Sequence, residues 1–594
     1  MDSPSPPRPI SPRIFAWEVP RSLRALVRAR ESSLVLLGAG IGALAGLVVA
    51  IMSLGVTALH ALLFGVPPGQ RLSSQSALDP AIALAIPTVG GLMLGIALLV
   101  QRRWRPAREV DPIEANALYG GRMSLLGSLS VALQTVWSSG VGASVGLEAG
   151  YTQLASGIAS GIGRAFHVRR QDLRLLVGCG AAGAIAGAFA APLAGAFYAF
   201  ELIIGGYSIA SLAPVGVAAL IGYVIATRLD PAPLGIGALY VSQVTNRDLA
   251  TAAALGLVAA GAGIALMVGV ARCERLLKSL RIPSYLRPAL GGAVVGALAT
   301  ITPQVLSSGH GAIHVAAMSD EPLRSALLLF LLKAVASMVS LGTGFRGGLF
   351  FASLLLGTLG GSLFADAATA VWPALQLDPH IYAIIGMGAF SVSVIGAPLT
   401  MTFIALETTG DLWLTTAVLV AVIVSALVTR ETFGYSFATW RFHLRGETIR
   451  SAADVGWLRD LTVRRMMRPD MRTVPANTTI SRFRTAFPLG STSQVVAVDE
   501  DKDYAGIVNV AEAHASNVQD TKPVRDILHF ADIALLPTMT VKEAVAAFDK
   551  AEAEALAVIQ SSESRRVIGL LGEAHALRRY TEQLELRRRE LIGE

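Results

Sequence analysis

Long apolar runs recur between Ser33 and Thr429 and predict helices that cross a membrane. Several runs exceed the ~20 residues that a helix needs to span a bilayer, whereas others are shorter and broken by glycine or proline. Half-length helices are tolerated in a membrane where protein or a water-filled cavity shields their ends. The main runs are 33–63, 81–100, 175–204, 249–270, 326–341, 381–404 and 414–428.

The pattern changes after about Arg445, where the chain becomes charged and alternates apolar strands with amphipathic helices. Segments 494–515 and 555–579 both indicate strand, turn, strand and helix, and both contain Glu-Ala-His-Ala. An amphipathic helix precedes each copy. Such repetition predicts a tandem α/β module. The expected divisions are a cytoplasmic segment 1–32, a membrane domain 33–445, a linker 446–460, the tandem module 461–580 and a charged tail 581–594.

The membrane part is also duplicated. "APLAGAFYAFE" (191–201) and "APLTMTFIALE" (397–407) share Ala-Pro-Leu and a final Glu, and "GVGASVGLEA" (140–149) aligns with "GTGFRGGLFF" (342–351). Both pairs keep the same order along the chain. Duplicated halves with broken helices are typical of transporters and channels, whose site lies where the repeats meet.

Composition supports a polytopic membrane protein, because 53% of the residues are hydrophobic and 15% are charged. The net charge of +7 comes largely from basic clusters beside the apolar runs. These clusters indicate a cytoplasmic amino terminus rather than nucleic-acid binding. Cys179 and Cys273 lie in different segments, which argues against a disulfide framework or a zinc site. No catalytic constellation or metal-ligand spacing is present, so we expect neither an enzyme nor a required cofactor.

The two glycine-rich segments predict an anion site. Each precedes an expected helix, at 148–163 and at 350–365. Helix amino termini carry partial positive charge and unpaired N–H groups, and glycine lets a ligand approach the backbone closely. If the two halves bring these helix starts together at the bilayer midplane, their amides bind an anion and repel cations.

Glu148 is the only charged residue between Met123 and Gly163. An acid near the bilayer centre costs ~2.5–3.5 kcal/mol on insertion scales. Stabilising the first turn of a helix returns only ~0.3–1 kcal/mol. We therefore expect a specific role, in which the carboxylate occupies the anion site as a tethered anion and frees it when protonated or displaced.

The membrane part, 33–445, resembles the bacterial type of the CLC family of chloride channels and chloride/proton antiporters. "GLEAG" (146–150), "GGLFFA" (347–352) and "GCGAAGAIAGAFAAPLAGAFYAFE" (178–201) carry the resemblance. It implies an all-α polytopic fold with inverted repeats, a homodimer with one pore per subunit, a cell inner or plasma membrane location, cytoplasmic termini and Glu148 as the gate. The anion-binding residues that it and the helix starts imply are Gly146, Leu147, Gly348, Leu349, Phe350 and Tyr435.

Three positions depart from the family pattern, one of them Ala149-Gly150, which replaces Gly-Pro after the gate. The family's Gly-Ser-Gly-Ile-Pro motif should fall near Pro112, but the chain reads "REVDP" (108–112), without a serine and with Glu109 and Asp111 close by. Selectivity among chloride, nitrate and fluoride therefore stays open. Arg346 stands where proline is usual. It either adds positive potential near the pore or caps a helix or faces lipid.

Other intramembrane charges have predicted structural roles. Glu201 and Glu407 end the matching Ala-Pro-Leu repeats and are expected to accept backbone N–H bonds. Lys333 can snorkel, pair with a carbonyl or raise the potential of the pore, and a structural or pairing role is favoured. In exchangers of the family a second glutamate follows the first, where this chain has Leu202. The resemblance thus favours passive conduction, with proton-coupled antiport as the alternative.

The tandem module at 461–580 resembles a pair of CBS domains. A dimerisation tail and an adenine-nucleotide sensor are equally favoured readings. In the family an acidic residue after the second strand often contacts ribose; Glu512 matches it in the first copy, and His575 takes that place in the second.

Two other classes explain less of the sequence. A CBS-bearing cation transporter should have clustered intramembrane acids, but here they are solitary. A membrane-anchored nucleotide sensor would leave the duplicated, helix-broken half unexplained. We therefore expect chloride conduction with regulation by the CBS pair.

Overall fold

The computed structural model divides the chain into two compact units, with the boundary between Asp454 and Val455. This boundary falls within the stretch where the sequence predicts a linker. The structure describes residues 20, 31–67, 70–104, 109–230, 244–313, 322–434, 436–437, 439–440, 461–579 and 581–582. The predicted linker, and most of the predicted amino-terminal segment and charged tail, lie outside the described residues.

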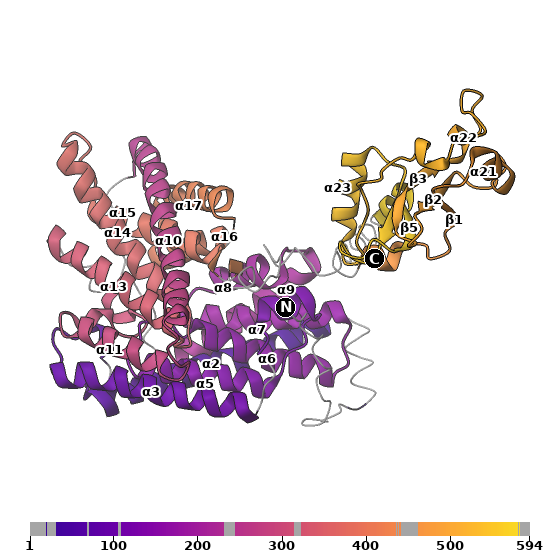
Figure 1. The fold of residues 1–594 in the computed structure, drawn as a ribbon. Helices are drawn as coiled ribbons and strands as arrows, with labels where there is room; N and C mark the ends of the chain where they lie inside the picture. The colour runs from indigo at the N-terminus through magenta and orange to yellow at the C-terminus, as the bar shows by residue number, and fades with distance from the viewer. Residues whose placement is uncertain are drawn as a thin grey trace. The chain divides into compact units, whose positions relative to one another are not determined.

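The membrane unit is entirely helical in its described part, which confirms the predicted fold class (Figure 1). Eight of its helices are long and apolar enough to cross a membrane. These are α2 (Glu31–Phe64), α3 (Pro80–Trp104), α7 (Arg170–Phe189), α9 (Ile209–Leu229), α10 (Asn246–Ser279), α13 (Leu323–Thr343), α14 (Phe350–Val371) and α17 (Leu412–Thr432). Shorter elements complete the unit: η1 (Leu72–Ser74), α4 (Pro112–Leu118), α5 (Leu125–Gly140), α6 (Glu148–Ala165), α8 (Pro192–Tyr198), η2 (Ala199–Ile204), α11 (Arg287–Ala299), η3 (Pro303–Val305), α15 (Pro379–Ile395) and α16 (Pro398–Thr409).

The Ala-Pro-Leu repeats encode helix breaks rather than continuous spans. Helix α7 ends at Phe189, the next residue Ala190 has φ +53°, and α8 begins at Pro192. Helix α15 ends at Ile395, the next residue Gly396 has φ +82°, and α16 begins at Pro398. A left-handed residue commonly ends a helix, and proline suits a first turn because its missing N–H has no partner there.

Small residues allow corresponding helix pairs in the two halves to approach closely. A Cβ at Gly180 of α7 would lie 2.6 Å from the carbonyl oxygen of Ala155 in α6. A Cβ at Gly386 of α15 would likewise collide with the carbonyl oxygen of Gly357 in α14. Both glycines belong to the repeated Gly-x-Gly-Ala sequence. The close backbone approach is therefore made by the third residue of this sequence in the first copy and by its first residue in the second copy.

The C-terminal unit is α/β and contains the same substructure twice. Strands β2 and β3 pair antiparallel. Their register shifts by one residue between the pairs Ala497↔Gly506 and Val498↔Tyr504. Strands β4 and β5 do the same at the corresponding positions. The elements are α20 (Val463–Met466), β1 (Thr473–Pro475), α21 (Ile480–Ala486), β2 (Gln494–Val498), β3 (Tyr504–Asn509), α22 (Val510–Ala513), η4 (Val524–Ile527), α23 (Val541–Ala551), β4 (Ala555–Ile559) and β5 (Val567–Gly572).

Candidate functional site

The two glycine-rich helix starts lie side by side, as the sequence predicts. The N–H of Gly146 donates to the carbonyl of Gly348 at 3.0 Å, and the N–H of Gly348 donates to the carbonyl of Gly146 at 3.2 Å. Helix α6 begins two residues after the first glycine, at Glu148, and α14 begins two residues after the second, at Phe350. The two repeats therefore meet at their helix amino termini.

Two buried serines hold these loops in place reciprocally. The backbone N–H of Arg346 donates to Ser138 Oγ at 3.0 Å, and the backbone N–H of Ser144 donates to Ser340 Oγ at 3.0 Å. The donors correspond to each other in the duplication, and so do the acceptors. Each half thus positions the loop of the other half. Sequence reasoning missed these serines, although both precede a Gly-x-Gly by the same spacing.

The carboxylate of Glu148 lies at the start of the opposite repeat's helix. Its Oε1 accepts a hydrogen bond from the N–H of Phe350 at 2.6 Å, and the residue is 5% exposed. Phe350 opens α14, so this N–H is one of the donors that the helix itself leaves unpaired. The other carboxyl oxygen of Glu148, Oε2, has no hydrogen-bond partner among the described residues. The carboxylate therefore sits where the partial positive charge of α14 favours an anion.

The glycines leave room for that carboxylate. A Cβ at either Gly146 or Gly348 would collide with the carboxyl oxygens of Glu148. Leu147 and Leu349 are both buried, so their side chains pack into the protein. The ring of Phe350 packs against Phe189, with centroids 4.4 Å apart. An apolar wall therefore borders the amide-lined position.

The predicted anion-binding residues also include Tyr435. Tyr435 lies outside the described residues. In the segment that replaces the family's serine motif, the Asp111 side chain accepts from the N–H of Ile113 at 2.8 Å and caps α4. Glu109 is half-buried and lies beside Gly127. An acidic side chain thus occupies the start of α4.

Glu201 and Glu407 cap each other's repeat, which confirms their predicted role. Glu201 accepts from the N–H groups of Leu399 and Thr400 at 2.8 and 2.9 Å. Glu407 accepts from the N–H groups of Leu193 and Ala194 at 2.8 and 2.9 Å. Each carboxylate satisfies unpaired donors at the start of α16 or α8.

Lys333 is fully buried and pairs with backbone carbonyls, in agreement with the favoured prediction. Its Nζ donates to the carbonyls of Val305 at 3.0 Å and Ser307 at 2.9 Å. The ammonium group therefore fixes the segment that follows η3 and does not reach toward a membrane surface.

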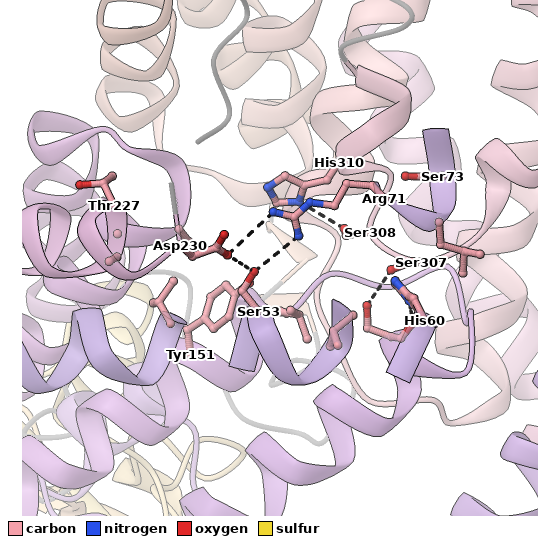
Figure 2. A pocket seen from close by; sticks show the side chains of 18 residues that line it. Ser53, His60, Arg71, Ser73, Tyr151, Thr227, Asp230, Ser307, Ser308 and His310 are labelled. Carbon is pink, nitrogen blue, oxygen red and sulfur yellow. Dashed lines mark hydrogen bonds and ion pairs between the residues drawn. The ribbon is translucent and has the colours of Figure 1, made fainter. Parts of the chain in front are cut away.

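A polar cavity adjoins the start of α6 (Figure 2). Its lining includes Leu147 and Tyr151, which flank Glu148, together with Arg71, Asp230 and His310. No sequence pattern indicates this cluster, because its members come from segments far apart in the chain.

The nucleotide-site candidates of the C-terminal unit belong to separate copies. Glu512 Oε2 lies 2.5 Å from His529 Nε2, so its carboxylate already has a partner. His575 is half-buried, and burial together with the nearby Arg468 lowers its pKa. Across the described part of the chain, no group of three or more metal-ligating side chains forms a candidate metal site. Cys179 and Cys273 are unpaired.

A duplicated membrane unit in which two helix starts meet at a buried carboxylate is the architecture of a channel or secondary transporter. The family model described as voltage gated chloride channel matches residues 90–430, more than half of the chain. A ClcB-like chloride channel protein from Ralstonia nicotianae is 33% identical over 335 residues, which cover 55% of this chain and 77% of that protein. The chain belongs to this family, the CLC family.

Solved structures show the same fold. A slow cyanobacterial Cl−/H+ antiporter is 19% identical with a TM-score of 0.59, covering 69% of this chain and 97% of its own. A eukaryotic CLC transporter is 19% identical with a TM-score of 0.60, covering 93% of this chain and 98% of its own.

Proposed function

We propose that this protein conducts chloride or a similar small anion across a membrane, through a pore in each subunit of a homodimer that Glu148 gates. The bond from Phe350 N–H to Glu148 Oε1 carries the proposal. In its ionised form the carboxylate takes the position at the start of α14 where a free anion would bind. Protonation, or movement of the side chain, releases that position.

We further propose that conduction is passive. Leu202, which follows the capping Glu201, is buried in an apolar cluster with Ile113, Ala181 and Ile203. A leucine side chain cannot accept a proton, and its surroundings offer water little polar contact. Proton-coupled antiport is the second candidate, favoured by the similarity in fold to the Cl−/H+ antiporter.

The test is reconstitution of the full-length protein into liposomes with simultaneous recording of chloride and pH. Wild-type vesicles should release chloride, and Glu148→Gln should release it faster at neutral pH because the amide cannot act as a tethered anion. Glu431→Gln is the matched control, since Glu431 lies exposed near the end of α17. Vesicles without chloride flux, or equal rates in all three proteins, would refute the proposal.

For the C-terminal unit we propose a regulatory CBS pair on the cytoplasmic side, where both termini would lie. A ribose hydroxyl at Glu512 would have to displace or share the contact with His529. Deletion of 458–594 should leave folded, conducting protein whose response to adenine nucleotides is altered. Calorimetry that detects no ATP or AMP binding, with flux unchanged by the deletion, would favour a structural tail.

A further inference from the structure

The cavity beside α6 lies next to the gate but does not contain it. Leu147 and Tyr151, one residue before and three after Glu148, form part of its wall, whereas Glu148 itself is not in the lining. The cavity has a volume of about 40 Å³. About 10–15 Å³ suffices to hold one water. The space therefore admits several waters or one small, partly hydrated anion.

The charged residues of the cavity follow the carboxyl ends of two long apolar helices. Helix α2 is long enough to cross the bilayer, and Arg71 follows its carboxyl end. Asp230 follows the carboxyl end of α9, and its carboxylate pairs with Arg71 (Figure 2). The side chains of Arg71 and Asp230 are 26% and 21% exposed. Both charged side chains are therefore partly exposed.

Among the described residues, the guanidinium of Arg71 makes only long contacts. Its NH2 group lies 3.9 Å from Asp230 Oδ2, and its NH1 group lies 3.5 Å from Ser53 Oγ. The shortest contact in this group is instead the hydroxyl of Ser53, which donates to Asp230 Oδ2 at 2.5 Å. An arginine side chain presents several N–H donors in a planar fork that suits anions. Asp230 thus neutralises part of the charge without saturating these donors.

Other polar residues that line the cavity lie near the start of α14. His310 packs on the ring of Phe351, with centroids 3.8 Å apart, and Phe351 directly follows Phe350. Ser308 Oγ lies 3.3 Å from His310 Nδ1. Behind this segment the buried ammonium of Lys333 holds the carbonyl of Ser307. Among the described residues, Asp230 is the only acidic one that lines the cavity.

We propose that this cavity is an entry site for a small monovalent anion, where Arg71 binds the ion before it reaches the gate and Asp230 competes for the same guanidinium. The proposal rests on the anion transport proposed above. One partly exposed charge is worth a modest attraction, and clefts of one sign raise the local concentration of an ion of the other sign. The effect should therefore appear at limiting anion concentration and should weaken as ionic strength rises.

The experiment is exchange of radioactive chloride in proteoliposomes of the full-length protein with equal chloride on both sides, so that random insertion does not matter. An impermeant anion keeps ionic strength constant at a low or a high level. At low ionic strength, Arg71→Gln should raise the half-saturating chloride concentration roughly two- to fivefold with little change in maximal rate. Arg71→Lys should keep most of the attraction, and Asp230→Asn should lower the half-saturating concentration.

Arg247→Gln is the matched control, because this exposed arginine lies near the start of α10 and does not line the cavity. An Arg71→Gln protein that matches this control would overturn the entry site, as would a loss of maximal rate at unchanged half-saturation. The opposite shift in Asp230→Asn excludes a folding defect, since damage would not improve apparent affinity. Wild-type vesicles that exchange no chloride would instead refute the proposed function.

Discussion

The two halves of the membrane unit agree in what holds them together and differ at the point where they meet. Glu201 and Glu407 occupy equivalent positions, and each caps the opposite repeat with bonds of nearly the same length. Ser138 and Ser340 also act reciprocally. At the facing helix starts, however, one half contributes Glu148 and the other contributes Phe350.

The difference separates scaffold from function. Glu201 and Glu407 recur in both halves and accept hydrogen bonds from backbone donors. These bonds at the helix starts offset the cost of burying a carboxylate. Glu148 has no counterpart, and its Oε2 lacks a partner among the described residues. The acid that breaks the symmetry is therefore the one that we expect to move, titrate or yield to an ion.

The largest expected effect tests that asymmetry directly. Wild-type chloride flux should rise as pH falls, because protonation removes the negative charge that competes for Phe350 N–H. A hydrogen bond to a charged group is worth about 1.5–3 kcal/mol, so the site should become about ten- to a hundredfold more available. Flux is measured from about pH 4 to pH 7.5, which spans the ordinary titration of a carboxyl group.

Glu148→Gln and Glu148→Ala should conduct at every pH in this range and should lose the pH dependence. The glutamine variant keeps the size of the side chain, and the alanine variant removes it, so agreement between them isolates the charge. Retention of wild-type pH dependence in Glu148→Gln would place the titrating group elsewhere and end the gate assignment.

Substitutions of the symmetric pair, Glu201 and Glu407, should lower the stability of the protein rather than change its gating. Glu201→Leu and Glu407→Leu each remove charge-assisted bonds to a helix start, and each should destabilise the protein by about 1.5–3 kcal/mol. The substitution Glu201→Leu should destabilise the protein more, because Glu201 also accepts a hydrogen bond from the hydroxyl of Thr400 at 2.7 Å. Thermal unfolding in detergent measures both, with Glu431→Leu as the control. Lost flux at unchanged unfolding temperature would contradict a scaffold role.

Duplication made two features of the sequence informative, although the equally duplicated Ser138 and Ser340 were missed. Two copies of Ala-Pro-Leu predicted the capping glutamates, and two glycine-rich segments predicted that Glu148 and Phe350 begin facing helices. The sequence was silent on the entry cavity, because Ser53 and Asp230 are brought together only by the packing of α2 against α9. A single arginine after a long apolar helix looks like any interfacial charge.

A smaller effect is expected from the serine pair that positions the loops. Ser138→Ala and Ser340→Ala each remove one neutral hydrogen bond, worth about 0.5–1.5 kcal/mol. Because the bonds are reciprocal, the two variants should destabilise the protein equally. Thermal unfolding checks this, with the exposed Ser325→Ala as the control. Strongly unequal losses would show that the two loops are not held in equivalent ways.

The smallest expected effect concerns protons. Leu202 follows Glu201 and Thr408 follows Glu407, so neither half adds a second acid after its capping glutamate. Leu202 is buried among apolar side chains, and the hydroxyl of Thr408 donates to the carbonyl of Ile404 at 2.7 Å. With no carboxylate to relay protons at either position, chloride flux should carry almost none, and its reversal potential should follow the chloride gradient alone when a pH gradient is imposed. A reversal potential that shifts with pH in a fixed ratio, and stops shifting in Glu148→Gln, would establish antiport and show that protons reach the gate by another route than the position after Glu201.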